Sequence, residues 1–540
     1  MVLWAFKNLS RLAICASIIA LAAPSVTDVS NVVDLGYAKY AGNFTAPHAV
    51  AYLGVPYAEP PLGDRRFRAP LSLDTNRVRR ESGGKTFDAR SYPDFCVQGT
   101  TGSGDAGGAG SEDCLKVNVY APAGAKPGDK LPVLVYIHGG GFVYGNPRNW
   151  PFDHWINQSP NVVIVSVYYR LDSFGFLTHP DFASDKSLGD LNAGFLDQRE
   201  ALRWVQKHII AFGGDPGRVT INGQSAGGAS VELHLVARGE DGLFQGAIAQ
   251  SVYRTPVPTP QQQAPLFEHY ASQAGCGTGS VVEKMDCLRK ASVSALARAQ
   301  DNRFNGSYRA YHPVLDANTI TELPTVSILN GRFRKLPLIV GATSNETLSS
   351  GDISSALKTF FPALTDEDLS QFSERYPLSA FSSSDEQFRS ATGESELRCA
   401  REIMGTEFSK RTKAFAYRYN QANPTSGSTI VNHAAENWMM FQGTNTGFNG
   451  TTTFTTMTPT EDAFAEELIA YWLSFVRSFD PNKFKLSRSP TWPAFTSSHP
   501  QRIVLQEGTT VTSDSYAETI TAAENGRCNF VASKVQHQQN

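Results

Sequence analysis

Apolar residues along this chain gather into short runs, which cover residues 131–137, 162–169, 246–251 and 336–340. The run 131–137 is continuous, and a continuous apolar run of strand length is typical of a strand buried on both faces of a parallel sheet. Between them, apolar residues return at helical spacing over 197–210 and 226–237. Strand and helix therefore alternate, which predicts an α/β fold with a mostly parallel central sheet and helices on both of its faces.

After residue 256 the pattern becomes looser, with helical stretches as far as residue 372. No internal repeat or low-complexity linker marks a boundary there, so we interpret this region as helical insertions over the sheet and its functional site. Large α/β folds often run long as single units. We therefore expect residues 23–540 to form one domain.

The first residues have the order of a secretory signal: Lys7 and Arg11, an apolar run over 12–22, and small residues before Pro24. This apolar run is too short to span a bilayer. We expect residues 1–22 to be removed as a signal peptide. The mature protein is then expected to be secreted and extracellular, without a stable membrane anchor.

The composition favours a small uncharged partner. Of 540 residues, 41% are hydrophobic and 18% are charged, and the formal net charge is -3. A large core can be built from this material, but there is no excess of basic residues for binding nucleic acid. No sequence feature indicates an oligomeric state.

Six cysteines remain once the signal is removed: Cys96, Cys114, Cys276, Cys287, Cys399 and Cys528. An even number in an oxidising compartment favours disulfides. Short spacing favours pairing Cys96 with Cys114 and Cys276 with Cys287. Cys399 and Cys528 are then left as the third pair. The alternative is a metal site, but the sequence has no CxxC motif and no nearby cluster of cysteine and histidine, so we expect no metal.

Candidate N-glycosylation acceptors are Asn43, Asn157, Asn305 and Asn449. Asn157 is the weakest of them, because Pro160 follows its serine. Asn345-Glu346-Thr347 also spells an acceptor, which we expect to remain unused if Glu346 is buried in a functional site.

The strongest candidate for chemistry is Ser225, in the sequence GQSAG over 223–227. A GxSxG elbow joins a strand to a helix through a strained turn and exposes the serine hydroxyl at the edge of a sheet. Side chains at Gly223 and Gly227 would collide with the neighbouring strand and helix. An apolar run precedes the motif and a helical pattern follows it, which is the context that the motif requires.

A second motif, HGGG over 138–141, follows the apolar run 131–137. Bare backbone N–H groups beside a cavity can stabilise the oxyanion of a tetrahedral intermediate. Together with the serine elbow, this motif predicts an oxyanion hole made by the N–H groups of Gly140, Gly141 and Ala226, the last being the residue after the nucleophile.

A serine nucleophile needs a histidine base and a carboxylate that orients it, and in this type of sheet they follow in the order serine, acid, histidine. His433 follows a strand-like run, whereas His499 lies in a turn-like sequence and His537 in the polar tail, so we prefer His433. For the acid, Glu346 and Asp352 both follow the run 336–340, and spacing barely separates them.

These motifs and several others resemble the type-B carboxylesterase/lipase family, which includes cholinesterases and has the α/β-hydrolase fold. The resemblance extends over the mature chain and rests on 54–61 (GVPYAEPP), 112–115 (EDCL), 138–142 (HGGGF), 212–216 (FGGDP), 223–227 (GQSAG) and 479–482 (FDPN). It implies a triad of Ser225, Glu346 and His433, hydrolysis of carboxylic esters through an acyl-enzyme, and no cofactor. It also implies the first two disulfides and offers a model for pairing Cys399 with Cys528.

The chain departs from the family pattern in two places. Gln224 stands where the family usually has glutamate, and Thr343 to Thr347 keeps only the glutamate of the usual acid motif. No aromatic residue lies between Val97 and Asp113, where choline-ester enzymes hold a cation, and the segment is too short and glycine-rich for a lipase lid. We expect a small-molecule uncharged ester as substrate. The alternatives are a lipase or sterol esterase, and an inactive adhesion or scaffold protein.

Overall fold

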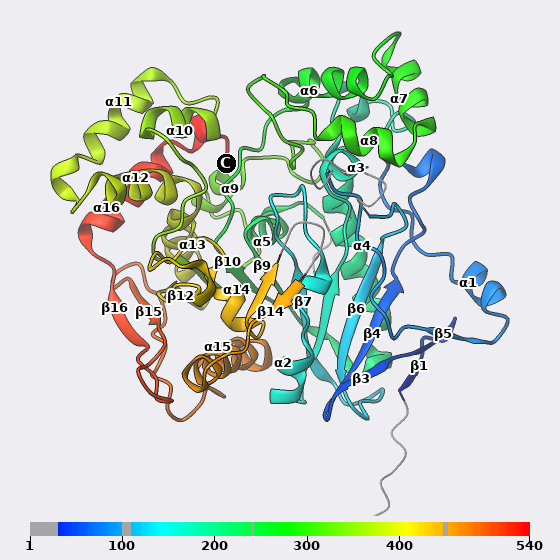
Figure 1. Cartoon of the computed structure of the whole chain (residues 1–540), viewed down its shortest axis with the longest axis horizontal. Helices are drawn as coiled ribbons and strands as arrows, with labels where there is room; N and C mark the ends of the chain where they lie inside the picture. Colours follow the sequence, from blue (N-terminus) through cyan, green and yellow to red (C-terminus); the bar gives the residue numbers. More distant parts are fainter. Residues whose placement is uncertain (1–30, 100–109, 240–241, 447–451) are drawn as a thin grey trace, which may run out of the picture. The chain divides into compact units, whose positions relative to one another are not determined.

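A large mixed sheet runs through the middle of the protein (Figure 1). The computed structural model describes residues 31–99, 110–239, 242–446 and 452–540, so the expected signal peptide lies outside the described residues. Across the described sheet the strands are β16 (Tyr516–Thr519), β15 (Gln501–Leu505), β12 (Ala414–Tyr419), β11 (Leu338–Thr343), β10 (Gly246–Gln250), β9 (Gly214–Gln224), β7 (Leu131–Ile137), β8 (Val163–Val167), β6 (Lys116–Pro122), β4 (Ala49–Pro56) and β3 (Asn43–Ala46).

The seven strands from β15 to β8 in this order pair in parallel, and the remaining pairs at the two edges of the described sheet are antiparallel. Two small sheets stand apart from it, one of β1 (Val32–Asp34), β2 (Lys39–Ala41) and β5 (Thr86–Asp88), and one of β13 (Thr444–Thr446) and β14 (Thr452–Phe454). The mostly parallel sheet expected from the apolar runs is confirmed.

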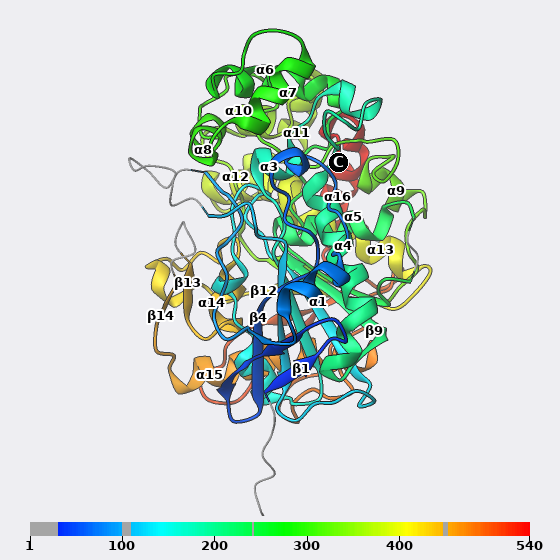
Figure 2. The same ribbon diagram turned by 90° about the vertical axis from the view of Figure 1, so that its right-hand side faces the viewer.

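Two layers of core lie on opposite faces of the large sheet, because successive side chains of a strand point to opposite sides. In β7, Val133 and Val135 belong to one layer, whereas Leu134 and Tyr136 belong to the other. The first layer packs against α4 (Ala193–His208), α5 (Ala226–Val236) and α13 (Cys399–Ser409), and the second against α2 (Asp153–Gln158), α14 (Ala435–Met440) and α15 (Pro459–Ser478). Figure 2 shows α4, α5 and α13 on one side of the strands and α14 and α15 on the other.

The expected helical insertions lie in two connections of the sheet. Between β10 and β11 the chain forms α6 (Pro260–Gln273), α7 (Val281–Lys290), α8 (Val293–Gln300) and α9 (Pro324–Leu329). Between β11 and β12 it forms α10 (Ile353–Phe360), α11 (Asp366–Arg375) and α12 (Ser384–Gly393) before α13. In Figure 1 most of these helices gather at one end of the strands, above α5. The other helices are α1 (Thr75–Ser82), α3 (Asp172–Phe176), α16 (Ala522–Ser533) and α17 (Val535–Gln538).

Two strands contain a glycine near their carboxyl ends. Strand β4 continues through Gly54 to Pro56. Strand β11 extends beyond the apolar run 336–340, through Gly341, to Thr343. A Cβ on Gly341 would lie 2.0 Å from the ring of Tyr417 on the adjacent β12, so this glycine makes room for a neighbouring side chain rather than ending the strand.

The six cysteines expected to remain after removal of the signal are all paired in the structure. Disulfides join Cys96 to Cys114, Cys276 to Cys287, and Cys399 to Cys528. Asn43, Asn157 and Asn305 are exposed, and Asn449 lies outside the described residues. Among the described residues, no helix has both the length and the apolar character needed to cross a bilayer.

Candidate active site

Ser225 lies in a strained turn between β9 and α5. Its backbone has φ 60° and ψ -122°, a conformation that non-glycine residues rarely adopt. The turn is tightly enclosed: a Cβ on Gly223 would lie 2.3 Å from the carbonyl oxygen of Gly227, and one on Gly227 would lie 2.0 Å from that of Ile137. The backbone N–H of Ser225 donates to Gln250 at the end of β10 (2.9 Å). The serine is thus held at the carboxyl end of the parallel strands.

His433 joins Ser225 to Glu346 through both of its ring nitrogens. Nε2 lies 2.8 Å from the Ser225 Oγ, and Nδ1 lies 2.7 Å from a carboxylate oxygen of Glu346. The other carboxylate oxygen accepts the backbone N–H of Thr343 at 3.0 Å. These residues follow β9, β11 and β12, whose carboxyl ends meet at one edge of the sheet, so residues far apart in sequence converge there.

The electrostatics of the site favour a basic imidazole. Burial lowers the pKa of His433, but the hydrogen bond and the charge of Glu346 outweigh this effect, helped by Glu436 and Glu396, so the pKa is raised above its ordinary value. Glu346 itself is completely buried. A carboxylate bonded to Nδ1–H holds the ring with Nε2 directed at the serine, which is the orientation a general base requires.

The glycine loop lies directly against the serine turn. A Cβ on Gly139 would lie 2.4 Å from the carbonyl oxygen of Gln224 and 2.9 Å from the Cβ of Ser225. Gly140 has φ +114°, which favours glycine, and its carbonyl accepts the N–H groups of Val143 and Tyr144. The loop therefore turns on itself, with its backbone in contact with Ser225.

The amides expected to form the oxyanion hole remain available in this arrangement. Within the described residues, the N–H groups of Gly140 and Gly141 donate to no acceptor. Ala226 is the first residue of α5, so its N–H has no carbonyl of the preceding turn to bind. Three free donors beside Ser225 suit a developing negative charge on oxygen.

Two residues to which sequence reasoning gave no separate role hold this loop. His138 is buried between Tyr169 and Trp150, and its carbonyl accepts the hydroxyl of Tyr169 at 2.8 Å. Its Nδ1 lies 2.8 Å from the carbonyl oxygen of Gly139, and burial lowers its pKa to about 4, so the ring stays neutral. Gln98 pairs with both backbone groups of Gly145 on the other side of the loop.

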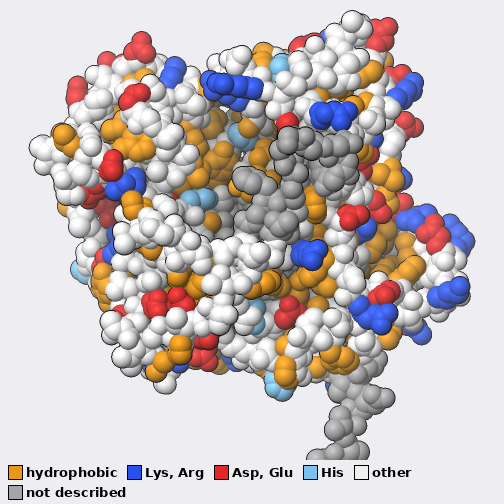
Figure 3. Space-filling view, viewed as in Figure 1, with side chains coloured by type: hydrophobic (Ala, Val, Ile, Leu, Met, Phe, Trp, Pro, Cys, Tyr) orange, Lys and Arg blue, Asp and Glu red, His pale blue; other side chains and the backbone are white. Residues whose placement is uncertain are grey.

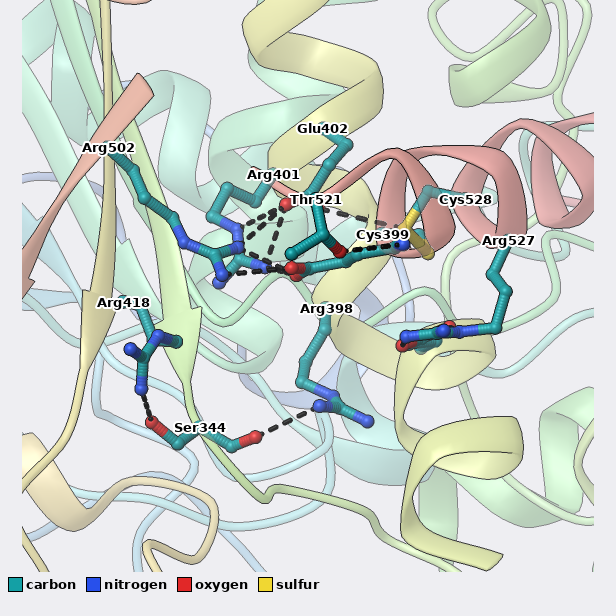
Figure 4. A network of polar contacts seen from close by, with 12 residues as sticks. Ser344, Arg398, Cys399, Arg401, Glu402, Arg418, Arg502, Thr521, Arg527 and Cys528 are labelled. Atoms are coloured by element: carbon teal, nitrogen blue, oxygen red, sulfur yellow. Dashed lines mark hydrogen bonds and ion pairs between the residues drawn. A yellow bond between two sulfur atoms is a disulfide. The ribbon is translucent and has the colours of Figure 1, made fainter. Parts of the chain in front are cut away.

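A network of arginines braces the loop that carries Glu346 (Figure 4). Arg398 donates to the carbonyl oxygen of Ser344, and Arg418 donates to its hydroxyl, both at 2.9 Å. Arg398 immediately precedes Cys399, whose disulfide ties α13 to α16. No sequence motif indicated these residues, because their contacts come from segments far apart in the chain.

The other candidates for the acid and the base of the site do not contact Ser225. Asp352 is exposed and caps α10 by accepting the N–H of Ser355. His499 is exposed in a turn, and His537 pairs with Asp368 (2.6 Å). The structure therefore brings Glu346 and His433, and none of these three, to Ser225.

A cavity of about 380 Å³ opens beside the serine. It is lined by Ser225, His433, Gly139, Gly140, Trp150 and Trp438, among others. In its wall, Gln224 accepts a long hydrogen bond from Asn437 (3.4 Å). Neither carboxylate oxygen of the adjacent, buried Glu436 has a partner among the described residues. Burial, and next the charge of Glu346, raises the pKa of Glu436 to about 7.

One group of possible metal ligands occurs among the described residues, formed by Glu394, Cys399 and Cys528. The two sulfurs are joined in a disulfide, so they are not thiolates that could bind a metal. The carboxylate of Glu394 instead accepts hydrogen bonds from Tyr376 and Arg527.

This chain is similar to known proteins both in sequence and in structure. The model of the carboxylesterase family matches residues 30–530. Lipase 5 of Diutina rugosa is 33% identical over 61% of this chain and 66% of its own length, and an acetylcholinesterase of Bungarus fasciatus is 29% identical over 85% and 79%. The crystal structure of Aspergillus niger EstA superposes with a TM-score of 0.83 at 28% identity, covering 95% of this chain and 99% of that one.

Proposed function

Because this chain belongs to the carboxylesterase family, we propose that it is a secreted serine esterase that hydrolyses uncharged carboxylic esters through an acyl-enzyme. The proposal rests on two hydrogen bonds that link Ser225 to His433 and His433 to Glu346. Beside them lie the free backbone N–H groups of the glycine loop and of α5. The expected signal sequence and the three disulfides support secretion, since disulfides persist in oxidising compartments.

In the first half of the reaction, His433 Nε2 takes the proton of Ser225 as Oγ forms a bond to the ester carbonyl carbon. The N–H groups of Gly140, Gly141 and Ala226 stabilise the oxyanion, and Glu346 stabilises the imidazolium. When the tetrahedral intermediate collapses, the carbon–oxygen bond to the alcohol breaks, and His433 gives its proton to the departing oxygen.

In the second half, His433 takes a proton from water as the water oxygen attacks the acyl carbon. Collapse of the second tetrahedral intermediate breaks the bond to Ser225 Oγ, which recovers the proton. The products are a carboxylic acid and an alcohol, and every proton transfer uses the same imidazole.

The test is hydrolysis of p-nitrophenyl butyrate by the Ser225→Ala variant, with labelling by a fluorophosphonate probe. We expect kcat to fall by roughly 10⁴-fold or more, since a triad acts as a unit, and labelling to disappear. Ser497→Ala is the matched control, because that serine is exposed and remote in sequence from the site. A Ser225→Ala variant that hydrolyses the ester at the wild-type rate refutes the proposal.

We further propose that soluble esters are preferred to lipid aggregates. The proposal rests on the short glycine-rich segment after Cys96, of which residues 100–109 lie outside the described residues. The test is the rate of tributyrin hydrolysis across its solubility limit. A steep rise in rate above that limit would contradict a preference for soluble esters.

A further inference from the structure

A second cavity, of about 440 Å³, opens near the serine and is separate from the one that contains His433. Its walls include Tyr253, Thr255, Gln263, His312, Leu348 and Phe360. The backbone N–H of Tyr253 donates to the carbonyl oxygen of Ser225 (3.3 Å), and Leu348 follows Glu346 by two residues. Figure 3 shows a hollow on this face with hydrophobic side chains and histidine inside it.

The position of His433 decides which half of an ester this cavity can receive. The alcohol oxygen must approach Nε2 of His433, because that nitrogen supplies its proton. His433 lines the first cavity and is not among the residues that line the second. With the carbonyl carbon at Ser225, the alcohol extends into the first cavity, and the second cavity, whose Tyr253 adjoins Ser225, offers room for the acyl group.

The second cavity has an aromatic wall. The rings of Tyr253 and Phe360 meet edge to face with centroids 5.8 Å apart, and those of Tyr253 and His312 do so at 6.1 Å. The ring of Phe142, next to the glycine loop, lies 6.5 Å from His312. Rings arranged edge to face offer both faces and edges to a further flat ring, so an aromatic acyl group fits this wall better than a flexible chain.

His312 is a polar group in this wall that has hydrogen-bonding capacity to spare. Its Nδ1 lies 3.1 Å from the hydroxyl of the buried Thr255, whereas its Nε2 has no partner among the described residues. The side chain is partly accessible although protein surrounds it, as expected for a residue facing an internal cavity. Burial lowers its pKa to about 4, so the ring is neutral at ordinary pH.

We propose that His312 Nε2 forms a hydrogen bond with a hydroxyl group on the acyl part of the substrate, and that the enzyme prefers esters of hydroxylated aromatic acids. A hydroxyl both donates and accepts, so it suits either tautomer of the imidazole. An acyl group without one would desolvate Nε2 and leave it unpaired, which is costly in a buried site. This inference rests on the proposed esterase function.

The experiment compares matched esters: methyl 3-phenylpropanoate with its 3-hydroxyphenyl and 4-hydroxyphenyl analogues. For the wild type we expect kcat/KM to be about tenfold higher for the better hydroxylated ester, as one neutral hydrogen bond typically provides. In His312→Phe, which keeps a ring of similar shape, the ratio should fall to about one. Phe360→Leu is the matched control, because it changes the apolar wall and should affect the plain and hydroxylated esters alike.

Each outcome has a distinct meaning. A wild-type ratio near one overturns the inference without any variant, and so does a His312→Phe variant that keeps the wild-type ratio while a fluorophosphonate still labels Ser225. If the wild type fails to hydrolyse p-nitrophenyl acetate, whose acetyl group is too short to need the aromatic wall, the proposed esterase function itself fails. Hydrolysis of that ester with no preference for hydroxylated acids refutes the role of His312 alone.

Discussion

Replacing Glu436 by glutamine should change how the stability of the protein depends on pH. Glu436 is 1% exposed, lies three residues after His433, and has no hydrogen-bond partner for either oxygen among the described residues. Its pKa is raised from the ordinary 4.5 to about 7, first by burial and then by the charge of Glu346. The folded protein therefore holds this proton more tightly than the unfolded chain does.

The sign and size of the effect follow by linkage. A raised pKa contributes stability that is fully present below pH 4.5 and is lost as the pH rises through about 7. At about 1.4 kcal/mol for each pKa unit, the loss approaches about 3 kcal/mol by pH 9. Glutamine has nearly the same shape and does not ionise, so the variant should lack this part of the pH dependence.

The assay is urea unfolding at pH 5 and pH 9, from which the free energy of unfolding is extrapolated. We expect the wild type to lose about 3 kcal/mol more than Glu436→Gln between these values. Glu374→Gln, an exposed glutamate on α11, is the matched control and should follow the wild type. If the free energies of unfolding of wild type and Glu436→Gln fall by the same amount between pH 5 and pH 9, ionisation of Glu436 does not contribute to the pH dependence and the prediction is wrong.

Three further predictions concern the site and its support. Gly140→Ala places a methyl 2.1 Å from the carbonyl oxygen of Tyr144 at a φ of +114°, so kcat should fall by roughly 100-fold or more, and an unchanged kcat would contradict its role in the oxyanion hole. Serine at both Cys399 and Cys528 opens a bridge across a separation of 129 residues and should lower the free energy of unfolding by about 2–5 kcal/mol, as denaturant titration would show. Because the pKa of His433 is raised above 6.5, kcat/KM should fall as the pH drops through a value above 6.5, and a midpoint well below it would refute this.

The fold could be predicted from sequence wherever one physical signal dominated. The run 131–137 coincides with β7 because a strand buried on both faces has only apolar residues. The helical pattern over 226–237 coincides with α5 (Ala226–Val236) for an equally local reason, the spacing of its apolar residues. The glycine at position 341 makes room for the ring of Tyr417 on the neighbouring strand, which local sequence does not reveal.

The candidate site divides in the same way. Ser225 and the glycines of 139–141 could be recognised from the sequence, because the chemistry expected of them requires short motifs of fixed spacing. The choice between Glu346 and Asp352 depends on which carboxylate the fold turns inward, and spacing alone could not make it. The roles of Arg398 and His312 depend on tertiary neighbours, Ser344 for one and a cavity for the other, so no motif could have indicated them.

The backbone contact between the glycine loop and the serine turn has a consequence for engineering this protein. A single added carbon at Gly139 would strike Gln224 and Ser225, so the two loops form one closely packed block with no room for a side chain at that position. Mutant libraries aimed at new substrates should therefore leave this block untouched and diversify the insertions between β10 and β12. Acceptance of bulkier molecules can then change there without disturbing the reactive atoms.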